Sequence, residues 1–282
     1  MAKTKIQRCR SAVEKELKAV KKQEEALLKA AGRQEAPRWK QTLEEKIPEG
    51  VYQNLQKAFG KAFSIIFTKG TGIIEKSFHR EAIQEDHQVQ SFAFQVKASQ
   101  KALKRVRGSA GAANRMNLAV TAAEGIGLGI FGIGLPDIVI FVGVLLKGVY
   151  ETALHYGFDY TSDGERYFIL KLMETAMLKG EVWIDSNAHI DQLIDEGISK
   201  EHQTDNIDQQ IHETASAFAM DMVFMKFVQG LPVIGIIGGA GNPMYYSRVI
   251  KYVELKYRKR YLLNIQKRLE EEELCRCNYE SP

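Results

Sequence analysis

Two apolar segments interrupted by glycine and proline restrict what this chain can fold into. The first spans residues 118–150 and the second residues 227–241. Glycine costs about 1 kcal/mol and proline about 3 kcal/mol in a helix interior, so neither segment favours one continuous helix. Each segment instead predicts a helix, an apolar turn and a second helix. Because proline suits a first helical turn, the second helices are expected to open at Leu135-Pro136-Asp137 and at Asn242-Pro243.

The rest of the chain has the periodicity of helices rather than strands. Apolar residues recur at helical spacing from Ile6 to Leu27, which predicts a basic amphipathic helix ending near Gly32. No alternating run typical of a strand is found, so the fold class is all-α. We expect a single helical domain built round two glycine-rich helix–turn–helix units, with the N-terminal amphipathic helix added to it. Further helices are predicted at residues 51–67, 73–83, 89–106 and 211–227, with a small, flexible stretch at residues 108–111.

The expected divisions of the chain follow from these patterns. Residues 1–35 form the N-terminal helix, residues 36–270 the helical domain and residues 271–282 a polar tail. No apolar run follows the basic residues at the start, so no signal peptide is expected. Apolar residues make up 45% of the chain and charged residues 26%, which excludes wholesale disorder. An odd count of three cysteines excludes a disulfide scaffold and favours a reducing compartment.

Charge is distributed in blocks along the 282 residues, although the net charge is only +4. Residues 88–123 hold six basic side chains and no acid, residues 151–226 hold 15 acids against five bases, and residues 248–268 hold eight bases and one acid. Blocks of like charge concern partners and orientation rather than fold. Both basic blocks adjoin apolar segments, as cations beside a membrane do, which favours lipid headgroups or an acidic protein face over nucleic acid.

Three arrangements of the two apolar segments stay open. A helical domain could bury them as close-packed turns, they could dip into a bilayer interface, or they could span the bilayer. Spanning would place the charge of Asp137 at membrane depth, which is costly. The expected membrane or partner contacts are Ile126, Leu128, Ile130, Phe131, Ile133, Val233, Ile234, Ile236 and Ile237. The cations expected to hold headgroups are Lys101, Lys104, Arg105, Arg107, Lys251, Arg258, Lys259 and Arg260.

Several motifs resemble those of the EcsC family. The resemblance covers roughly Pro37 to Ile265 and leaves the N-terminal helix outside, so the helical domain is expected to be EcsC-like. That family takes its name from a bacterial operon that also encodes an ATP-binding cassette transporter. The resemblance therefore implies a bacterial, membrane-linked accessory role, and it implies no particular reaction. The motifs are Phe131 to Pro136 with Asp137, Tyr156-Gly157-Phe158-Asp159, Glu165-Arg166-Tyr167-Phe168, Gly230-Leu231-Pro232 with Gly238 to Asn242, and upstream Trp39, Ile47-Pro48 and Lys69-Gly70.

Few residues have the spacing of a catalytic site. His155 and Asp159 lie four apart, as a general base and its orienting acid would on one helix face, and Glu165 follows them. A lone His–Asp pair more often makes a structural hydrogen bond. The glycines at residues 127–132 match the dinucleotide-binding pattern but lack a preceding strand, so no cofactor is expected. The acidic block has no spacing that fixes a metal site.

These observations favour a non-enzymatic, membrane-associated accessory or regulatory protein linked to a transporter or other membrane complex. It is expected to be cytoplasmic and peripheral at the inner face of the membrane, with an integral placement as the alternative. The expected partner is membrane lipid or a membrane protein complex, and not nucleic acid. Two other functions stay open, namely a metal-dependent hydrolase centred on His155 and Asp159 and a protein that binds lipid or another small molecule.

Overall fold

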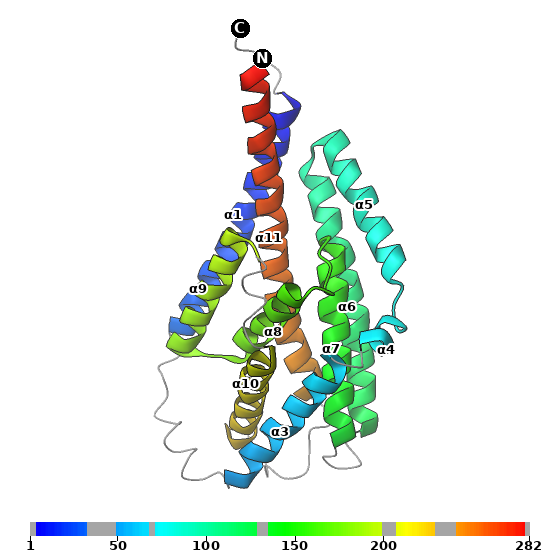
Figure 1. Ribbon diagram of the computed structural model, residues 1–282, viewed down its shortest axis with the longest axis vertical. Helices are drawn as coiled ribbons and strands as arrows, with labels where there is room; N and C mark the ends of the chain where they lie inside the picture. Colours follow the sequence, from blue (N-terminus) through cyan, green and yellow to red (C-terminus); the bar gives the residue numbers. More distant parts are fainter. Residues whose placement is uncertain are drawn as a thin grey trace.

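The computed structural model describes residues 4–32, 49–67, 71–128, 135–198, 207–228 and 241–279. Every regular element within these ranges is a helix, and no strand occurs in them, which confirms the predicted all-α class (Figure 1). In chain order the helices are α1 (Lys5–Gly32), α3 (Glu49–Ile65), α4 (Thr71–Glu75), α5 (Arg80–Lys97), α6 (Gln100–Leu128), α7 (Leu135–His155), α8 (Asp163–Met177), α9 (Gly180–Glu196), α10 (Ile207–Val228) and α11 (Gly241–Tyr279).

Helix α11 is the element around which the others are arranged. It is 39 residues long and packs against α1, α6, α7 and α8. Helix α1 runs beside it in the opposite direction, so that the start of α1 and the end of α11 lie together at the top of Figure 1. Residues 271–279 of the expected polar tail continue this helix, which ends at Tyr279.

The N-terminal helix forms as predicted over Lys5–Gly32. It lies against α11, α9 and α6, and therefore covers one side of the bundle. Its inward face consists of aliphatic residues at helical spacing together with one cysteine and one carboxylate. The buried residues are Ile6, Cys9, Ala12, Val13, Glu16, Val20 and Ala31.

Both predicted helix starts after the glycine-rich segments are confirmed. Helix α7 begins at Leu135 with Pro136 in its first turn, and α11 begins at Gly241 with Pro243 in its first turn. Proline tolerates these positions because the first amide groups of a helix have no intrahelical partner. The turns themselves, at residues 129–134 and 229–240, lie outside the described residues.

The helices between residues 71 and 128 end at other positions than predicted. Helix α4 stops where the Ser77 hydroxyl donates to the carbonyl of Ile74 at 2.6 Å, so that the helix expected over residues 73–83 is broken. The next break falls at Ala98, whose left-handed φ of 47° ends α5, and not at the glycines of residues 108–111, which are helical. Small residues alone do not stop a helix, whereas a left-handed residue does.

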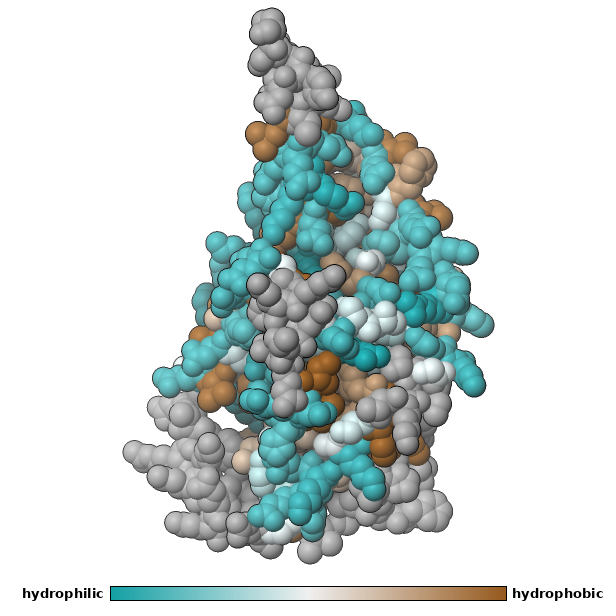
Figure 2. Space-filling view, viewed as in Figure 1, coloured by the Kyte–Doolittle hydropathy of each residue, from teal (hydrophilic) through white to brown (hydrophobic). Residues whose placement is uncertain are grey.

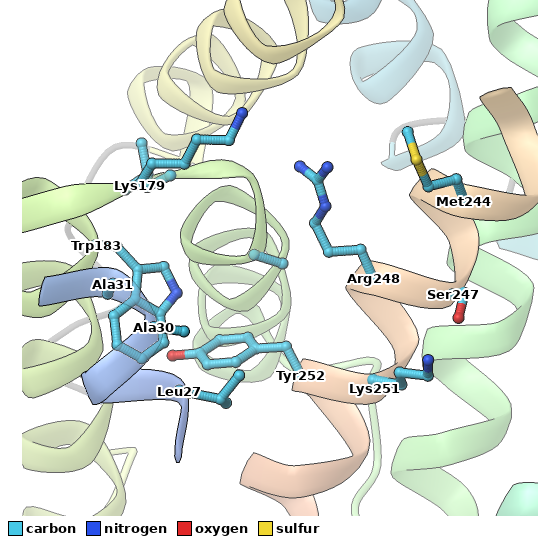
Figure 3. A pocket seen from close by; sticks show the side chains of 12 residues that line it. Leu27, Ala30, Ala31, Lys179, Trp183, Met244, Ser247, Arg248, Lys251 and Tyr252 are labelled. Carbon is cyan, nitrogen blue, oxygen red and sulfur yellow. The ribbon is translucent and has the colours of Figure 1, made fainter. Parts of the chain in front are cut away.

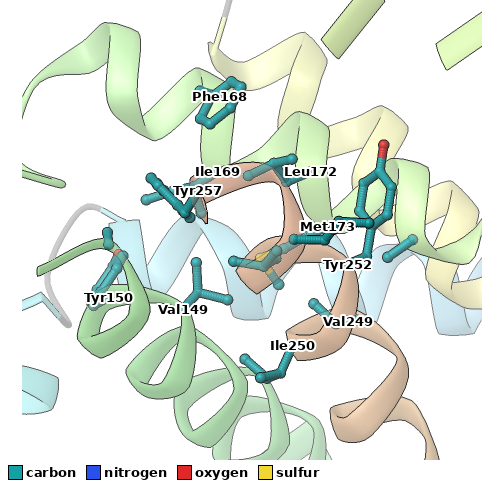
Figure 4. Close-up of a cluster of buried hydrophobic side chains, with 14 of the residues drawn as sticks. Val149, Tyr150, Phe168, Ile169, Leu172, Met173, Val249, Ile250, Tyr252 and Tyr257 are labelled. Atoms are coloured by element: carbon teal, nitrogen blue, oxygen red, sulfur yellow. The ribbon is translucent and has the colours of Figure 1, made fainter. Parts of the chain in front are cut away.

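The core is apolar and aromatic where α7, α8 and α11 meet (Figure 4). Val149 of α7, Ile169 of α8 and Val249 of α11 belong to this cluster, and all three are fully buried. The Tyr150 ring stacks on Tyr160 at 4.2 Å between centroids. Because α7 supplies buried residues from Ile138 to His155, its strong hydrophobicity is explained by packing inside the bundle.

Helix α7 also holds the single described stretch that is long and apolar enough to cross a membrane, Ile138–His155. Within the fold, 67% of that stretch is buried by other parts of the protein. The core helix of a globular bundle has the same length and composition. The hydrophobicity of α7 is therefore weak support for the spanning arrangement.

Candidate functional site

The three predicted catalytic residues do not form one constellation. No hydrogen bond or ion pair among the described residues joins His155, Asp159 and Glu165 to one another, and none of the three lines a hollow described below. Asp159 instead accepts from Arg80 at 3.0 Å, and the backbone carbonyl of His155 accepts from the ring of His87 at 2.9 Å. The described residues also contain no group of three metal-ligating side chains. This geometry gives the hydrolase hypothesis no support.

Glu165 has a structural role between α8 and α11. The Ser162 hydroxyl caps α8 by accepting from the Glu165 amide, which holds the first turn in place. The Glu165 carboxylate accepts from the Tyr257 hydroxyl at 2.6 Å, and both of its oxygens accept from one nitrogen, Nη1, of the Arg260 guanidinium at 2.8 Å. Arg260 also lies 4.0 Å from the ring centroid of Phe158. Glu165 is thus an internal counter-ion rather than a catalytic acid.

Helix α11 contains a run of cations that form ion pairs with carboxylates inside the protein. Arg258 is buried and paired with Glu16 of α1 at 2.5 Å. Lys256, which is 0% exposed, bridges Glu24 of α1 and Asp191 of α9 at 2.7 and 2.6 Å. Lys259 contacts the same two carboxylates.

These pairs correct part of the expected headgroup set. Arg258, Lys259 and Arg260 point into the protein, where carboxylates neutralise them, because α1, α8 and α9 close over this part of α11. Arg107 is half-buried, and Lys101, Lys104, Arg105 and Lys251 are exposed. The charge blocks therefore have an intramolecular explanation at α11, where basic residues meet acids of the middle of the chain and of α1.

The Tyr156-Gly157-Phe158-Asp159 motif forms the corner between α7 and α8. Tyr156 is buried and tilted against the Tyr261 ring at 5.8 Å, and Phe158 contacts the Tyr257 ring at 5.5 Å. Gly157 has a φ of 80°, a conformation that glycine adopts without strain. The motif therefore specifies a turn and its packing, and no side chain in it is arranged for chemistry.

A pair of histidines joins α5 to this corner. The His87 Nδ1–H donates to the carbonyl of His155, and its Nε2 lies 3.2 Å from the Ser91 hydroxyl. Burial lowers the pKa of both His87 and His155 below the usual 6.5, against the opposing charge of Asp86.

The histidine pair makes stability depend on pH. Because both pKa values are lowered in the folded state, the unfolded chain binds protons first as the pH falls below about 6.5. We expect the free energy of unfolding to be highest above that pH and to decline as the pH falls toward the folded-state values. Urea titrations at a series of pH values measure this, and His87→Gln should flatten the decline. His79→Gln, at an exposed position, is the control, and equal slopes in all three proteins would contradict the assignment.

The hairpin of α5 and α6 presents an unusual surface. Val89, Phe92 and Val96 are 66%, 66% and 55% exposed, and their spacing places them on one side of α5. Figure 2 shows apolar surface gathered over the upper part of α5, with polar surface around it. The opposite side of the helix buries Phe94 in the core. Helix α5 is therefore apolar on two sides, one of which has no cover among the described residues.

Cations surround the end of this hairpin. Lys97, Lys101, Lys104 and Arg105 are all exposed, and the ion pairs among the described residues engage none of them. The acids of α5, by contrast, lie toward its other end, with Asp86 the last of them. We call Val89, Phe92, Val96, Lys97, Lys101, Lys104 and Arg105 the hairpin surface. Its apolar part was missed from the sequence, although valine and phenylalanine at three- and four-residue spacing were visible.

The other predicted contacts cannot be placed in the same way. Ile130, Phe131 and Ile133 lie outside the described residues, as do Val233, Ile234, Ile236 and Ile237. Ile126 and Leu128 belong to the last turns of α6, at positions whose side chains the structure does not describe. These positions stay predictions.

Comparison with known proteins gives one family. The model of the EcsC protein family matches residues 11–262. The match begins inside α1, so most of that helix belongs to the family's region, which corrects the expectation that the resemblance begins near Pro37. No curated protein and no solved structure gives a significant match to the chain.

Proposed function

Because the chain belongs to the EcsC family, we propose that it is a non-enzymatic accessory protein that binds peripherally to the anionic inner face of a membrane. The observation that carries the proposal is the hairpin surface, where exposed apolar side chains adjoin exposed cations that no ion pair among the described residues engages. We also propose that the protein acts as an accessory or regulatory protein for a transporter or another membrane complex. The resemblance to a family named after a transporter operon motivates that finer part.

The two components of the hairpin surface suit a bilayer interface together. Burial of apolar area contributes about 25 cal/mol per Å², so a phenylalanine and two valines supply a favourable but modest term. Each cation near an anionic membrane contributes about 1 kcal/mol more. Neither component is sufficient for stable attachment alone, and peripheral proteins combine the two.

The glycine-rich turns stay in the proposal as a second contact. Their isoleucines and phenylalanine are the residues expected from the sequence to enter the interface, and Lys251 is an exposed cation of α11, the helix that follows the second turn in the sequence. A protein held at the hairpin surface and at the turns would have a defined orientation on the membrane. Substitutions in the turns and in the hairpin surface separate the two contacts.

Vesicle flotation tests the proposal. We expect the protein to float with vesicles of phosphatidylcholine and phosphatidylserine, and to float less with phosphatidylcholine alone or in high salt. Phe92→Asp/Val96→Asp and Lys101→Glu/Lys104→Glu should each reduce flotation several-fold. The matched control is Val182→Asp, because Val182 of α9 is 61% exposed but lies in the acidic block away from the hairpin.

Failure to float with anionic vesicles would contradict a lipid partner. If the protein then bound native membranes and was released by a carbonate wash, a membrane protein would be the partner instead. A variant with Ile130→Asp/Ile236→Asp separates the contacts. Loss of flotation in that variant, with normal flotation of the hairpin variants, would place the contact at the glycine-rich turns.

A further inference from the structure

An open hollow lies between the end of α1, the junction of α8 with α9, and the first turns of α11 (Figure 3). Its volume is about 530 Å³, within the range of small-molecule sites. It shares no residue with the hairpin surface. One wall is apolar and aromatic, formed by Leu27 and Ala30 of α1, Trp183 of α9 and Tyr252 of α11.

The opposite side of the hollow is cationic. In Figure 3 the side chains of Lys179 and Arg248 extend toward one another, away from Trp183 and Tyr252. Lys251 is a third cation of the lining, and the described lining residues include no carboxylate. The hollow is therefore polarised, with an apolar end and a positive end.

The positive end keeps a positive charge and hydrogen-bond donors that Asp221 does not satisfy. Lys179 and Arg248 share the single carboxylate of Asp221, at 2.5 and 2.7 Å, and Asp221 is 2% exposed. One carboxylate cannot neutralise two cations, so a positive charge remains. The Lys179 and Arg248 side chains are 25% and 30% exposed, and only one guanidinium nitrogen of Arg248 donates to Asp221. A guanidinium has five N–H donors, so Arg248 has donors left to reach an anion in the hollow.

We propose that this hollow binds an anionic amphiphile, with its carboxylate or phosphate held by Lys179 and Arg248 and its hydrocarbon chain against Leu27, Trp183 and Tyr252. A purely apolar ligand would leave the cations unpaired, and a small inorganic anion would leave the aromatic wall uncovered. Only a molecule with both parts satisfies the two ends. This binding function is independent of attachment through the hairpin surface.

The fluorescence of Trp183 can report binding in this hollow. The chain has two tryptophans, of which Trp183 lines the hollow and Trp39 lies outside the described residues. In the full-length Trp39→Phe protein, the emission of Trp183 should change saturably with dodecanoate below its critical micelle concentration. Lysophosphatidate, tested in parallel, distinguishes a phosphate head from a carboxylate head. Acetate should have no effect, and dodecyltrimethylammonium should bind at least about tenfold more weakly.

Two variants test the two ends of the hollow. Arg248→Gln keeps a donor for Asp221 but removes the charge, and should weaken binding of dodecanoate about tenfold. Ala30→Phe fills the apolar end from an exposed position on α1, and should abolish binding while the thermal unfolding temperature stays unchanged. If Arg248→Gln fails to fold, Ala30→Phe decides the question. No saturable response to either anionic amphiphile, an equal response to dodecyltrimethylammonium, or full binding by Ala30→Phe would each overturn the proposal.

Discussion

Replacing Glu16 by alanine is expected to lower the free energy of unfolding by about 3–5 kcal/mol, which is the cost of leaving a buried charge without its partner. Glu16 and Arg258 are paired at 2.5 Å, and their side chains are only 3% and 5% exposed. Glu16 also accepts from Gln100 of α6 at 2.7 Å, so one carboxylate ties three helices together. In the variant, Arg258 keeps its charge inside the fold and loses its counter-ion.

The chain offers a matched control for this prediction. Arg10 and Glu273 also join α1 to α11, at 2.6 Å, but their side chains are 39% and 37% exposed. Because exposed ion pairs contribute about 0–1 kcal/mol, Arg10→Ala should have a small effect. Denaturant titration measures both variants, and equal losses would show that burial of the Glu16–Arg258 pair is not what makes it important.

The pH dependence of Glu16 gives the same pair a second readout. Burial by itself would raise the pKa of Glu16, but hydrogen bonds from Gln100 and Arg258 and the nearby guanidinium charges lower it overall. A carboxyl whose folded-state pKa lies below the usual 4.5 stabilises the fold above that pH, and loses this contribution as the pH falls through the folded-state value. The Glu16→Ala variant should therefore show a weaker loss of stability in acid than the parent protein.

Gly157→Ala is expected to cost about 2–4 kcal/mol, because a backbone penalty adds to a steric one. Gly157 has a φ of 80°, and a Cβ built on it would lie 2.3 Å from Nε2 of His87. His87 cannot easily withdraw, since its other ring nitrogen donates to the carbonyl of His155. The substitution should therefore loosen the contact of α5 with the corner between α7 and α8.

Gly197 separates the two contributions to this effect. It has a similar φ of 86°, but a Cβ at that position would meet nothing within 4 Å. Gly197→Ala should therefore cost only the backbone penalty, about 1 kcal/mol. In a His87→Ala background, the effect of Gly157→Ala should fall to the same size, which a double-mutant cycle measures. A full-size effect in that background would show that the ring of His87 is not the obstacle.

Local features of the fold could be predicted because their causes are local. The helix starts at Leu135 and Gly241 follow from proline in the first turn, and the burial of α1 follows from aliphatic residues at helical spacing. The break at Ala98 was missed, since alanine is a strong helix former and nothing in its own side chain favours the left-handed φ of 47° that it has at the end of α5.

The candidate site shows the opposite case. The cations around residue 260 have the composition of a membrane-facing block, yet Arg258 meets a carboxylate 242 residues away. No spacing along the chain encodes that encounter. Likewise, the apolar residues at 89, 92 and 96 could belong to a core helix, and they form a surface only because α6 and α7 cover the other side of α5.

Periodicity, proline position and the separation of charge into blocks were therefore readable from the chain alone, because each depends on neighbours within a few turns of helix. The packing of distant helices decided which charges are neutralised inside and which apolar residues face outward. The physical reason is that burial and counter-ion pairing are properties of pairs of elements, and the sequence of one element does not contain its partner.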